Sequence, residues 1–343
     1  MEKQNNTRRI PVSLSLGLMI LIIAAGIAAL SDFYFSSKAA ILEEATERAE
    51  QTLDNTILRV EKILDEVVTA ESNMKWLVLS HLESPDSMYT YSREILKNNP
   101  NVIGCSIAFE PYFFSKTEKW FSAYSYNEGD TILTEQEGTE RYDYYELEWY
   151  KKPKQLGKSY WIDPFRETDT GGIEVPDIIT SYCSPMYDRQ NRFVGVFSID
   201  ISLKWLSERI SDMKPYPNSY SVMIDTSGRF IVHPDSTRIF FDTIFDDNDI
   251  DLDSRMKLGR SMIAGDSGYK TYKKAGETFY TFYKPLGNTG WSVAIVCPES
   301  DVLDGYDRIN LQVFTATGIG LILLLCLCWY TLRSRARTKS QKN

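Results

Sequence analysis

Two uncharged apolar runs near the ends of this 343-residue chain constrain its fold more than any other feature. The first is PVSLSLGLMILIIAAGIAAL (residues 11–30), and the second is LQVFTATGIGLILLLCLCWYTL (residues 311–332). A helix needs about 20 such residues to cross roughly 30 Å of hydrocarbon. The sequence therefore predicts transmembrane helices at 11–31 and 311–332, with the lipid bilayer as their surroundings.

Basic residues flank the outer ends of both runs. They are Lys3, Arg8 and Arg9 before the first run, and Arg333, Arg335, Arg337, Lys339 and Lys342 after the second. Positive charge stays on the cytoplasmic side of a membrane. We therefore expect a bacterial inner-membrane protein with cytoplasmic ends at 1–10 and 333–343 and with residues 32–310 outside. The first run lacks a small-x-small cleavage site, which favours an uncleaved anchor over a signal peptide.

The region between the two runs is acidic. Without the eight terminal bases and Glu2, the chain keeps 30 basic and 46 acidic residues. A surface of this sign repels nucleic acid, which needs basic patches on its partner. Nucleic acid is therefore excluded as a ligand.

Motifs for catalysis or metal binding are absent from the sequence. The two histidines, His81 and His233, form no HExxH pattern, and AGDSG (264–268) is one residue short of a G-x-S-x-G elbow. The acidic run DDNDIDLD (246–253) lacks the glycine and closing glutamate of a calcium loop, so we interpret it as a solvated loop. We predict no exported enzyme, no metal and no cofactor.

Three cysteines lie in the outer region, at positions 105, 183 and 297, each within an apolar, strand-like stretch. Their odd number and the lack of CxxC spacing argue against a disulfide framework. Buried free thiols are the simpler interpretation, and a Cys105–Cys183 bridge is the alternative.

A long helix is predicted over residues 32–84, with a narrow apolar stripe at Leu53, Ile57, Val60, Leu64 and Val67. Such a stripe is typical of a coiled-coil seam or of a helix that lies on a domain. The helical pattern itself runs from Ser36 to about His81, and a helix of about 45 residues is roughly 65 Å long. The helix is therefore a stalk or a domain's spine, and a homodimer through residues 42–67 is one use of the stripe.

Strand-like segments follow, with few helices between them. They include 101–114, 177–188, 192–201, 219–225 and 290–298, and a short helix at 202–210 ends before the breaker PYPN (215–218). This order favours antiparallel sheets and an α+β class. We place domains at 85–214 and 215–300, and a connecting helix at 301–310.

Two predicted hairpins repeat the same turn chemistry at an offset of 37 residues. Asp188 and Asp225 open the turns, Asn191 and Gly228 occupy the same later position, and Arg and Phe follow in both. Aspartate bonds the turn backbone, and Asn or Gly tolerates positive φ. We interpret the match as shared turn chemistry and not as a duplicated domain.

Four segments together resemble the double Cache family of bacterial extracellular sensors. They are WYKKPKQLGKSYWIDPF (149–165), SPMYDRQNRFVGVFSIDISLKWL (184–206), DTSGRFIVHPD (225–235) and GWSVAIVCPESDVL (290–303). The resemblance covers nearly the whole region between the apolar runs. It implies two tandem PAS-like antiparallel-sheet domains on a long N-terminal helix, with small ligands bound in the membrane-distal domain and a smaller domain near the membrane.

The amino-acid-binding branch of that family has five ligand-facing positions, which fall here on Tyr142, Leu147, Trp149, Phe165 and Asp200. Leu147 replaces the family's arginine, which would clamp a carboxylate, and Phe165 replaces a hydroxyl donor. The resemblance implies an ammonium group at Asp200 and a cation over the rings of Trp149 and Tyr142. It therefore favours an amine, a quaternary ammonium or a neutral polar metabolite over ordinary amino acids.

Structural interpretations of the same residues stand beside this one. Asp200 can cap a helix at 202–210, Trp149 and Tyr150 can be core aromatics, and Trp161 and Phe165 can pack under a loop. The polar segment 166–177 is predicted to border the pocket. The complete set of predicted ligand-binding residues is Tyr142, Leu147, Trp149, Tyr150, Trp161, Phe165, Glu167, Asp169, Asp177, Tyr182 and Asp200.

The predicted function is an extracytoplasmic sensor that transmits a conformational signal across the membrane. Ligand would close segments 142–165 and 166–177, and the change would pass through helix 202–210 to residues 299–310. A ligand can drive this conformational change only if it binds the signalling conformation more tightly than the resting one. Because only RSRARTKSQKN follows the second run, we expect a separate cytoplasmic or membrane signalling partner. The alternatives are the sensory half of an enzyme-linked receptor (serine/threonine phosphatase, histidine kinase or cyclase) without its output domain, and a two-span structural or assembly protein.

Overall fold

The computed structural model describes the backbone of residues 12–166 and 177–340. The chain divides into two compact units. One unit is Arg48–Glu299, and the other combines residues up to Glu47 with residues from Ser300 onward. The mixed α/β architecture with a long first helix and antiparallel sheets confirms the predicted fold class.

The terminal unit holds the beginning of α1 (Val12–Ser80) and nearly all of α6 (Glu299–Ser340). Among the described residues, the helical stretch from Ile20 is the one long and apolar enough to cross a membrane. The apolar stretch described in α6, Leu311–Cys326, is shorter. The second span therefore stays a prediction.

The apolar stripe of α1 packs on the chain's own sheets. Leu53, Val60, Leu64 and Val67 are all buried, whereas Leu58 is 62% exposed. This confirms the interpretation of a helix that lies on a domain. A homodimer through residues 42–67 stays a prediction, and it would have to use the face that carries Leu58.

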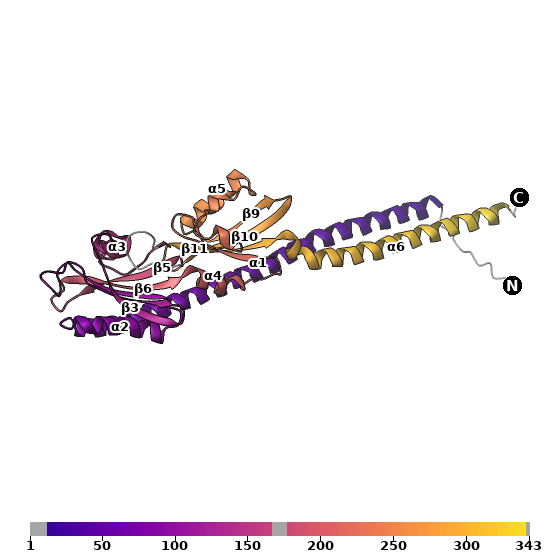
Figure 1. Cartoon of the computed structure of the whole chain (residues 1–343). Coiled ribbons are helices and arrows are strands. Elements are labelled where there is room, and N and C mark those ends of the chain that lie inside the picture. The colour runs from indigo at the N-terminus through magenta and orange to yellow at the C-terminus, as the bar shows by residue number, and fades with distance from the viewer. Residues whose placement is uncertain (1–11, 167–176, 341–343) are drawn as a thin grey trace. The chain divides into compact units, whose positions relative to one another are not determined.

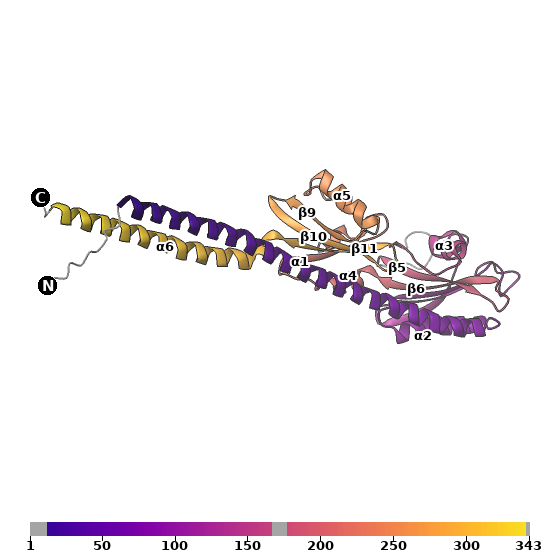
Figure 2. The same ribbon diagram turned by 180° about the vertical axis from the view of Figure 1, so that it is seen from behind.

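The first sheet has six antiparallel strands in the order β3-β2-β1-β6-β5-β4. Their bounds are β1 Gly104–Phe109, β2 Ser122–Glu128, β3 Thr131–Glu137, β4 Tyr160–Trp161, β5 Ile179–Tyr187 and β6 Phe193–Ser202. Helix α2 (Pro85–Asn98) lies on one side of this sheet and α3 (Glu148–Leu156) on the other, as both views show (Figures 1 and 2).

The two faces of the first sheet differ in what covers them. Toward α1 and α2, Lys75 of α1 donates a hydrogen bond to Ser184 Oγ (2.5 Å), and the hydroxyls of Ser92 and Ser125 are 2.8 Å apart. Because side chains alternate along a strand, the neighbours of these strand residues face the opposite side. That opposite side is covered by α3 and by the segment that leads into it.

Cysteines 105 and 183 lie on β1 and β5, the two strands that flank β6. Strands two places apart are separated by roughly 9.5 Å, which exceeds the Cα separation that a disulfide tolerates. Both cysteines and Cys297 are buried, and none of the three forms a disulfide. The interpretation as buried thiols is therefore confirmed, and the alternative bridge is wrong.

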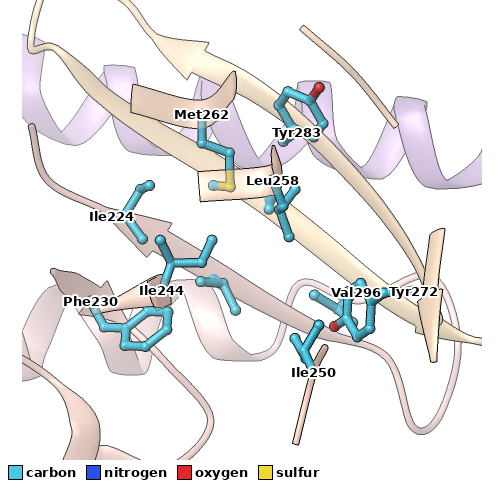
Figure 3. Close-up of a cluster of buried hydrophobic side chains, with 11 residues drawn as sticks. Ile224, Phe230, Ile244, Ile250, Leu258, Met262, Tyr272, Tyr283 and Val296 are labelled. Carbon is cyan, nitrogen blue, oxygen red and sulfur yellow. The ribbon is translucent and has the colours of Figure 1, made fainter. Parts of the chain in front are cut away.

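The second sheet has five antiparallel strands in the order β8-β7-β11-β10-β9. Their bounds are β7 Tyr220–Ile224, β8 Phe230–Val232, β9 Gly268–Lys274, β10 Glu277–Leu286 and β11 Trp291–Pro298. Helix α4 (Leu203–Ser211) connects the two sheets in sequence, and α5 (Leu252–Ile263) covers the second sheet. Figure 3 shows Leu258 and Met262 of α5 directed at strand residues such as Ile224 and Val296, within one apolar cluster.

The shared turn chemistry of the two hairpins is confirmed. Asp188 Oδ1 accepts from two backbone N–H groups of its turn, both at 2.9 Å. Asp225 Oδ1 does the same at 2.8 and 2.9 Å. Asn191 and Gly228 have φ of 59° and 87°, the conformation that these two residue types tolerate.

Several elements were missed or misread from sequence. No prediction was made for the helices α2, α3 and α5 or for the strands β2, β3 and β4, and the acidic run 246–253 is only partly a loop. The short helix η3 (Ile244–Asp246) ends at the first residue of the run, and Asp251 caps α5 by accepting from Ser254 N (2.9 Å). Asp247 binds Arg238 (3.3 Å) and Lys274 (3.4 Å). These acids are therefore structural partners of helices and basic residues.

Candidate ligand-binding site

A buried carboxylate lies near the centre of the first sheet. Asp200 of β6 is 5% exposed. Its Oδ1 accepts from Ser181 Oγ (2.7 Å) and Ser198 Oγ (3.2 Å), and its Oδ2 accepts from Tyr124 OH (3.3 Å). Burial nevertheless raises the pKa of this carboxyl above 3.8, because desolvation outweighs the three hydrogen bonds.

The absence of a side chain at Gly104 makes this arrangement possible. Gly104 stands opposite Asp200 across the β1–β6 pair. A Cβ at position 104 would lie 2.4 Å from Asp200 Oδ2 and 2.6 Å from Tyr124 OH. The glycine therefore leaves the space in which the carboxylate meets the tyrosine.

The alternative role of Asp200 as a helix cap is wrong. The residue that caps α4 is Ser202, whose Oγ accepts from Trp205 N (3.1 Å). Asp200 lies two residues earlier, inside the strand, and its side chain bonds across the sheet. It is consequently available to the face that α3 covers.

Three aromatic residues, which we call the aromatic wall, cover this carboxylate: Tyr142, Trp149 and Phe165. Trp149 is the second residue of α3 and donates from Nε1 to Tyr142 OH (3.3 Å). Between the wall and Asp200 is an inner cavity of about 10 Å³, roughly enough for one water molecule. Asp200 is therefore closed off in this conformation.

The other side of the aromatic wall borders a larger, outer cavity of about 650 Å³, a size that accommodates a small molecule. It is lined by Tyr142, Leu147, Glu148, Trp149, Ile162, Asp163, Pro164, Phe165 and Arg166 from the first sheet's segments, and by Arg229 and Phe240 from the second sheet's. Residues on both sides of the wall can therefore contact one ligand if the wall moves.

The structure brings together five of the predicted residues. Tyr142, Leu147, Trp149 and Phe165 line the outer cavity, and Asp200 lies behind three of them. Tyr142 and Trp149 also belong to the buried aromatic cluster of the first sheet. The wall and the core are thus built from the same side chains.

Other predicted residues lie elsewhere. Tyr150 is a core residue, 1% exposed, and its OH donates to Glu110 Oε1 (2.8 Å). Trp161 and Tyr182 line a different cavity, of about 1050 Å³, with residues of α1. They are on the α1 face because Tyr182 is next to Ser181, which faces Asp200, and adjacent strand residues point to opposite faces.

The acidic segment contributes less than predicted among the described residues. Asp177 Oδ2 accepts from Ser202 Oγ, and its Oδ1 accepts from Ile178 N (2.9 Å), so it supports the start of α4. Glu167 and Asp169 lie outside the described residues.

Sequence reasoning missed the partners of Asp200. Ser198 could have been predicted as a partner of Asp200 from the sequence alone, because residues two apart on a strand point to the same face. Ser181, Tyr124 and Gly104 come from other strands, and their positions depend on strand register. Arg229 and Phe240 were missed because they belong to the other sheet.

A family model described as Cache domain matches residues 37–306. Among solved structures, the extracellular domain of a protein described as a histidine kinase, mmHK1S-Z3, is 20% identical with a TM-score of 0.64, covering 78% of this chain and 98% of that one. The ligand-binding domain of Mlp24 with asparagine is 16% identical with a TM-score of 0.55, covering 78% and 99%.

A third similar structure is the ligand-binding domain of a Campylobacter jejuni chemoreceptor in complex with L-norvaline. It is 10% identical with a TM-score of 0.56, covering 77% of this chain and 94% of that one. At these identities the likeness concerns the fold alone. No curated protein matches the sequence.

Proposed function

Because this chain belongs to the Cache domain family, whose model matches residues 37–306, we propose that it is a bacterial membrane-anchored sensor that binds a small molecule outside the cytoplasm. Cache domains are sensor modules and not catalytic ones. In this proposal residues 85–214 form the membrane-distal, ligand-binding domain, and residues 215–300 form the membrane-proximal domain. Both termini lie in the cytoplasm.

The observation that carries the proposal is the buried carboxylate of Asp200 behind the aromatic wall. A buried charge is costly unless it is paired, and the three partners of Asp200 are neutral hydroxyls. A cationic group that displaces the wall would supply the missing charge. The rings of Tyr142 and Trp149 would then stabilise the same cation through their faces.

Leu147 narrows the class of ligand. Two structures with similar folds are described with asparagine and with L-norvaline. At the position of the amino-acid-binding family's arginine, this chain has Leu147, which cannot pair with an α-carboxylate. We therefore propose an amine, a quaternary ammonium or a neutral polar metabolite, contacted by Tyr142, Leu147, Trp149, Phe165 and Asp200.

A direct route leads from the site toward α6. Asp163, two residues before Phe165, accepts from Trp291 Nε1 of β11 (3.0 Å) and from the Thr226 hydroxyl. Strand β11 ends at Pro298, and α6 begins at the next residue. We propose that movement of the wall passes through Asp163 and Trp291 to α6.

The sensory half of an enzyme-linked receptor is the second candidate. It is favoured by the structural likeness to the extracellular domain of mmHK1S-Z3, which is described as a histidine kinase. Both candidates share the ligand site and differ in what receives the signal. An open reading frame for an output domain directly downstream would favour the second candidate.

The test is thermal unfolding of the full chain in detergent micelles with a panel of amines, quaternary ammonium compounds, neutral metabolites and α-amino acids. We expect at least one amine or neutral compound to raise the Tm, and an amine's effect to disappear in Asp200→Asn. Glu71→Gln is the matched control, because Glu71 is also a buried acid with a raised pKa but belongs to α1.

Two outcomes would contradict the proposal. A Tm shift with an ordinary α-amino acid that is lost in Leu147→Ala would overturn the ligand class. No shift with any compound would favour a structural or assembly protein.

A further inference from the structure

Two arginines occupy the same place in the two matched hairpins, but they are bonded differently. Arg192 binds Asp188 Oδ2 through both Nε (2.8 Å) and Nη2 (2.7 Å), and its side chain is 76% exposed. Arg229 binds Asp225 Oδ2 only through Nε (2.9 Å), and its side chain is 34% exposed. Neither Nη atom of Arg229 has a hydrogen-bond partner among the described residues.

Phe240 holds the guanidinium of Arg229 at the outer cavity. The Arg229 Cζ atom lies 5.1 Å from the centre of the Phe240 ring. Phe240 has a φ of 72°, a costly conformation for a bulky residue that the surrounding structure must enforce. Its N–H donates to Phe230 O at 2.8 Å. Both side chains line the outer cavity, so the free donors of Arg229 are fixed there.

The acidic residues of the outer cavity already have partners. Glu148 pairs with Lys152 (2.8 Å), and Asp163 accepts from Trp291 and Thr226. The other arginine of the lining, Arg166, lies over the Phe241 ring at 5.4 Å and forms no ion pair with a described residue. The cavity therefore has unfilled guanidinium donors and no unfilled carboxylate of its own among its described lining.

We propose that Arg229 binds an anionic group of the ligand, so that the ligand carries a positive group for Asp200 and an anionic group for the second sheet. A guanidinium recognises carboxylates, sulfonates and phosphates through paired N–H donors. Arg229 of the second sheet thereby supplies the positively charged partner for an anionic group, which Leu147 of the first sheet cannot supply. This inference rests on the proposed function, because it takes Asp200 as the cation site.

The position of the aromatic wall sets the spacing of the two ligand charges. Tyr142, Trp149 and Phe165 stand between Asp200 and the outer cavity, whereas Arg229 lines only the outer cavity. The two charges must therefore be further apart than the ammonium and carboxylate of an α-amino acid. The ligand class is a zwitterion with several bonds between its charged ends.

The experiment uses the full chain in detergent micelles and a series of ω-amino acids, from 3-aminopropanoate to 6-aminohexanoate. Each is compared by calorimetry with the amine and the carboxylate of the same chain length. We expect one ω-amino acid to bind about tenfold or more tightly than its matching amine, the effect of a charge-assisted hydrogen bond. In Arg229→Gln that advantage falls to less than about twofold.

Arg192→Gln is the matched control, because it breaks the same Asp–Arg pair in the same kind of turn but lies outside the outer cavity. It should keep the advantage of the ω-amino acid. Equal losses in both variants, with equal losses of Tm without ligand, would overturn the inference, since the turn and not the cavity would then be responsible.

The remaining outcomes separate this inference from the proposed function. If amines bind through Asp200 and no ω-amino acid binds better than its amine, the inference fails and the proposed function stands. If carboxylates bind through Arg229 and Asp200→Asn changes nothing, the anion site stands and the proposed role of Asp200 fails. If neither class binds, both fail.

Discussion

The two sheets place different residues at corresponding positions. Strand β6 leads into α4 and strand β11 leads into α6, and two residues before the end of each strand stand Asp200 and Val296. Asp200 lies between Gly104 and Ser181 on the neighbouring strands, whereas Val296 lies between Tyr220 and Thr281. Asp200 is polar and stands beside a glycine without a side chain, whereas Val296 is apolar and stands beside the large side chain of Tyr220.

The difference shows how one strand arrangement can make either a core or a binding site. In the second sheet, α5 and the strands bury Val296 in a continuous apolar cluster (Figure 3). In the first sheet, a carboxylate and three hydroxyls replace such side chains, and cavities lie on both sides of the aromatic wall. Because buried polar groups are costly without partners, the binding site depends on a few matched residues.

Val296→Asp should have the largest effect, because it places a carboxylate in the second sheet without the gap that Gly104 provides. We expect a loss of roughly 3–5 kcal/mol in the free energy of unfolding, the cost of an uncompensated buried charge. Denaturant unfolding of the full chain measures it, with Val296→Ala as the control for lost volume. A loss no larger than that of the alanine variant would show that the two positions are interchangeable.

Gly104→Ala should act on the first sheet through the contact between the new Cβ and Asp200 Oδ2. We expect a destabilisation of about 1–3 kcal/mol, typical of an overpacked site, together with weaker amine binding. Ser106→Ala is the control, since it is on the same strand and lines the inner cavity. If both variants behave alike in thermal unfolding and amine titration, the space at residue 104 is unimportant.

Trp291→Phe should weaken the link between the sheets by removing the N–H that Asp163 accepts. The expected loss is about 1 kcal/mol, the value of one hydrogen bond, because the Thr226 hydroxyl still binds Asp163. Denaturant unfolding measures the loss, and Trp205→Phe serves as a control on α4. An unchanged midpoint would argue against Asp163 as the connection to β11.

The mildest test changes pH. Burial raises the pKa of Asp200 above 3.8, so the folded chain holds this proton more tightly than the unfolded chain. The resulting stabilisation is complete below pH 3.8 and is lost as pH rises through the raised pKa. Relative to Asp200→Asn, the wild type should therefore lose stability across this window while amine binding strengthens. Unfolding and titration from about pH 4 to pH 8 test both trends; parallel stability curves for the two proteins would contradict this.

Local patterns predicted most of the strands and the turns of the two matched hairpins, because these depend on alternation and on residues such as Asp188 and Gly228. They did not predict α3, whose residues Trp149 and Tyr150 are apolar and aromatic enough to suit a strand equally well. Its helix is set by packing against β5 and β6 and ends at Gly157, with a φ of 64°. Tertiary contacts decided that element.

The sequence predicted the site residues whose positions depend on one local segment, but not those that are brought together by strand register or by the second sheet. Counting back from the Asp188 turn pairs Ser181 with Ile199, but a bulge shifts the register between Met186 and Tyr187, and Ser181 faces Asp200. A one-residue shift reverses the face of every side chain, so this bulge decides that Ser181 faces Asp200 and that Tyr182 lies on the α1 side. Arg229 requires the arrangement of both sheets, which no local pattern contains.

The empty position at Gly104 also has an evolutionary consequence. Every other amino acid has a Cβ, so any missense change at this codon alters Asp200 before the new side chain matters. Residues 104 and 200 should consequently vary together among relatives: lineages that keep the acid keep the glycine, and lineages that lose the acid are free to fill the gap. Covariation at this pair would then mark the point at which a sensor of this kind changed its ligand.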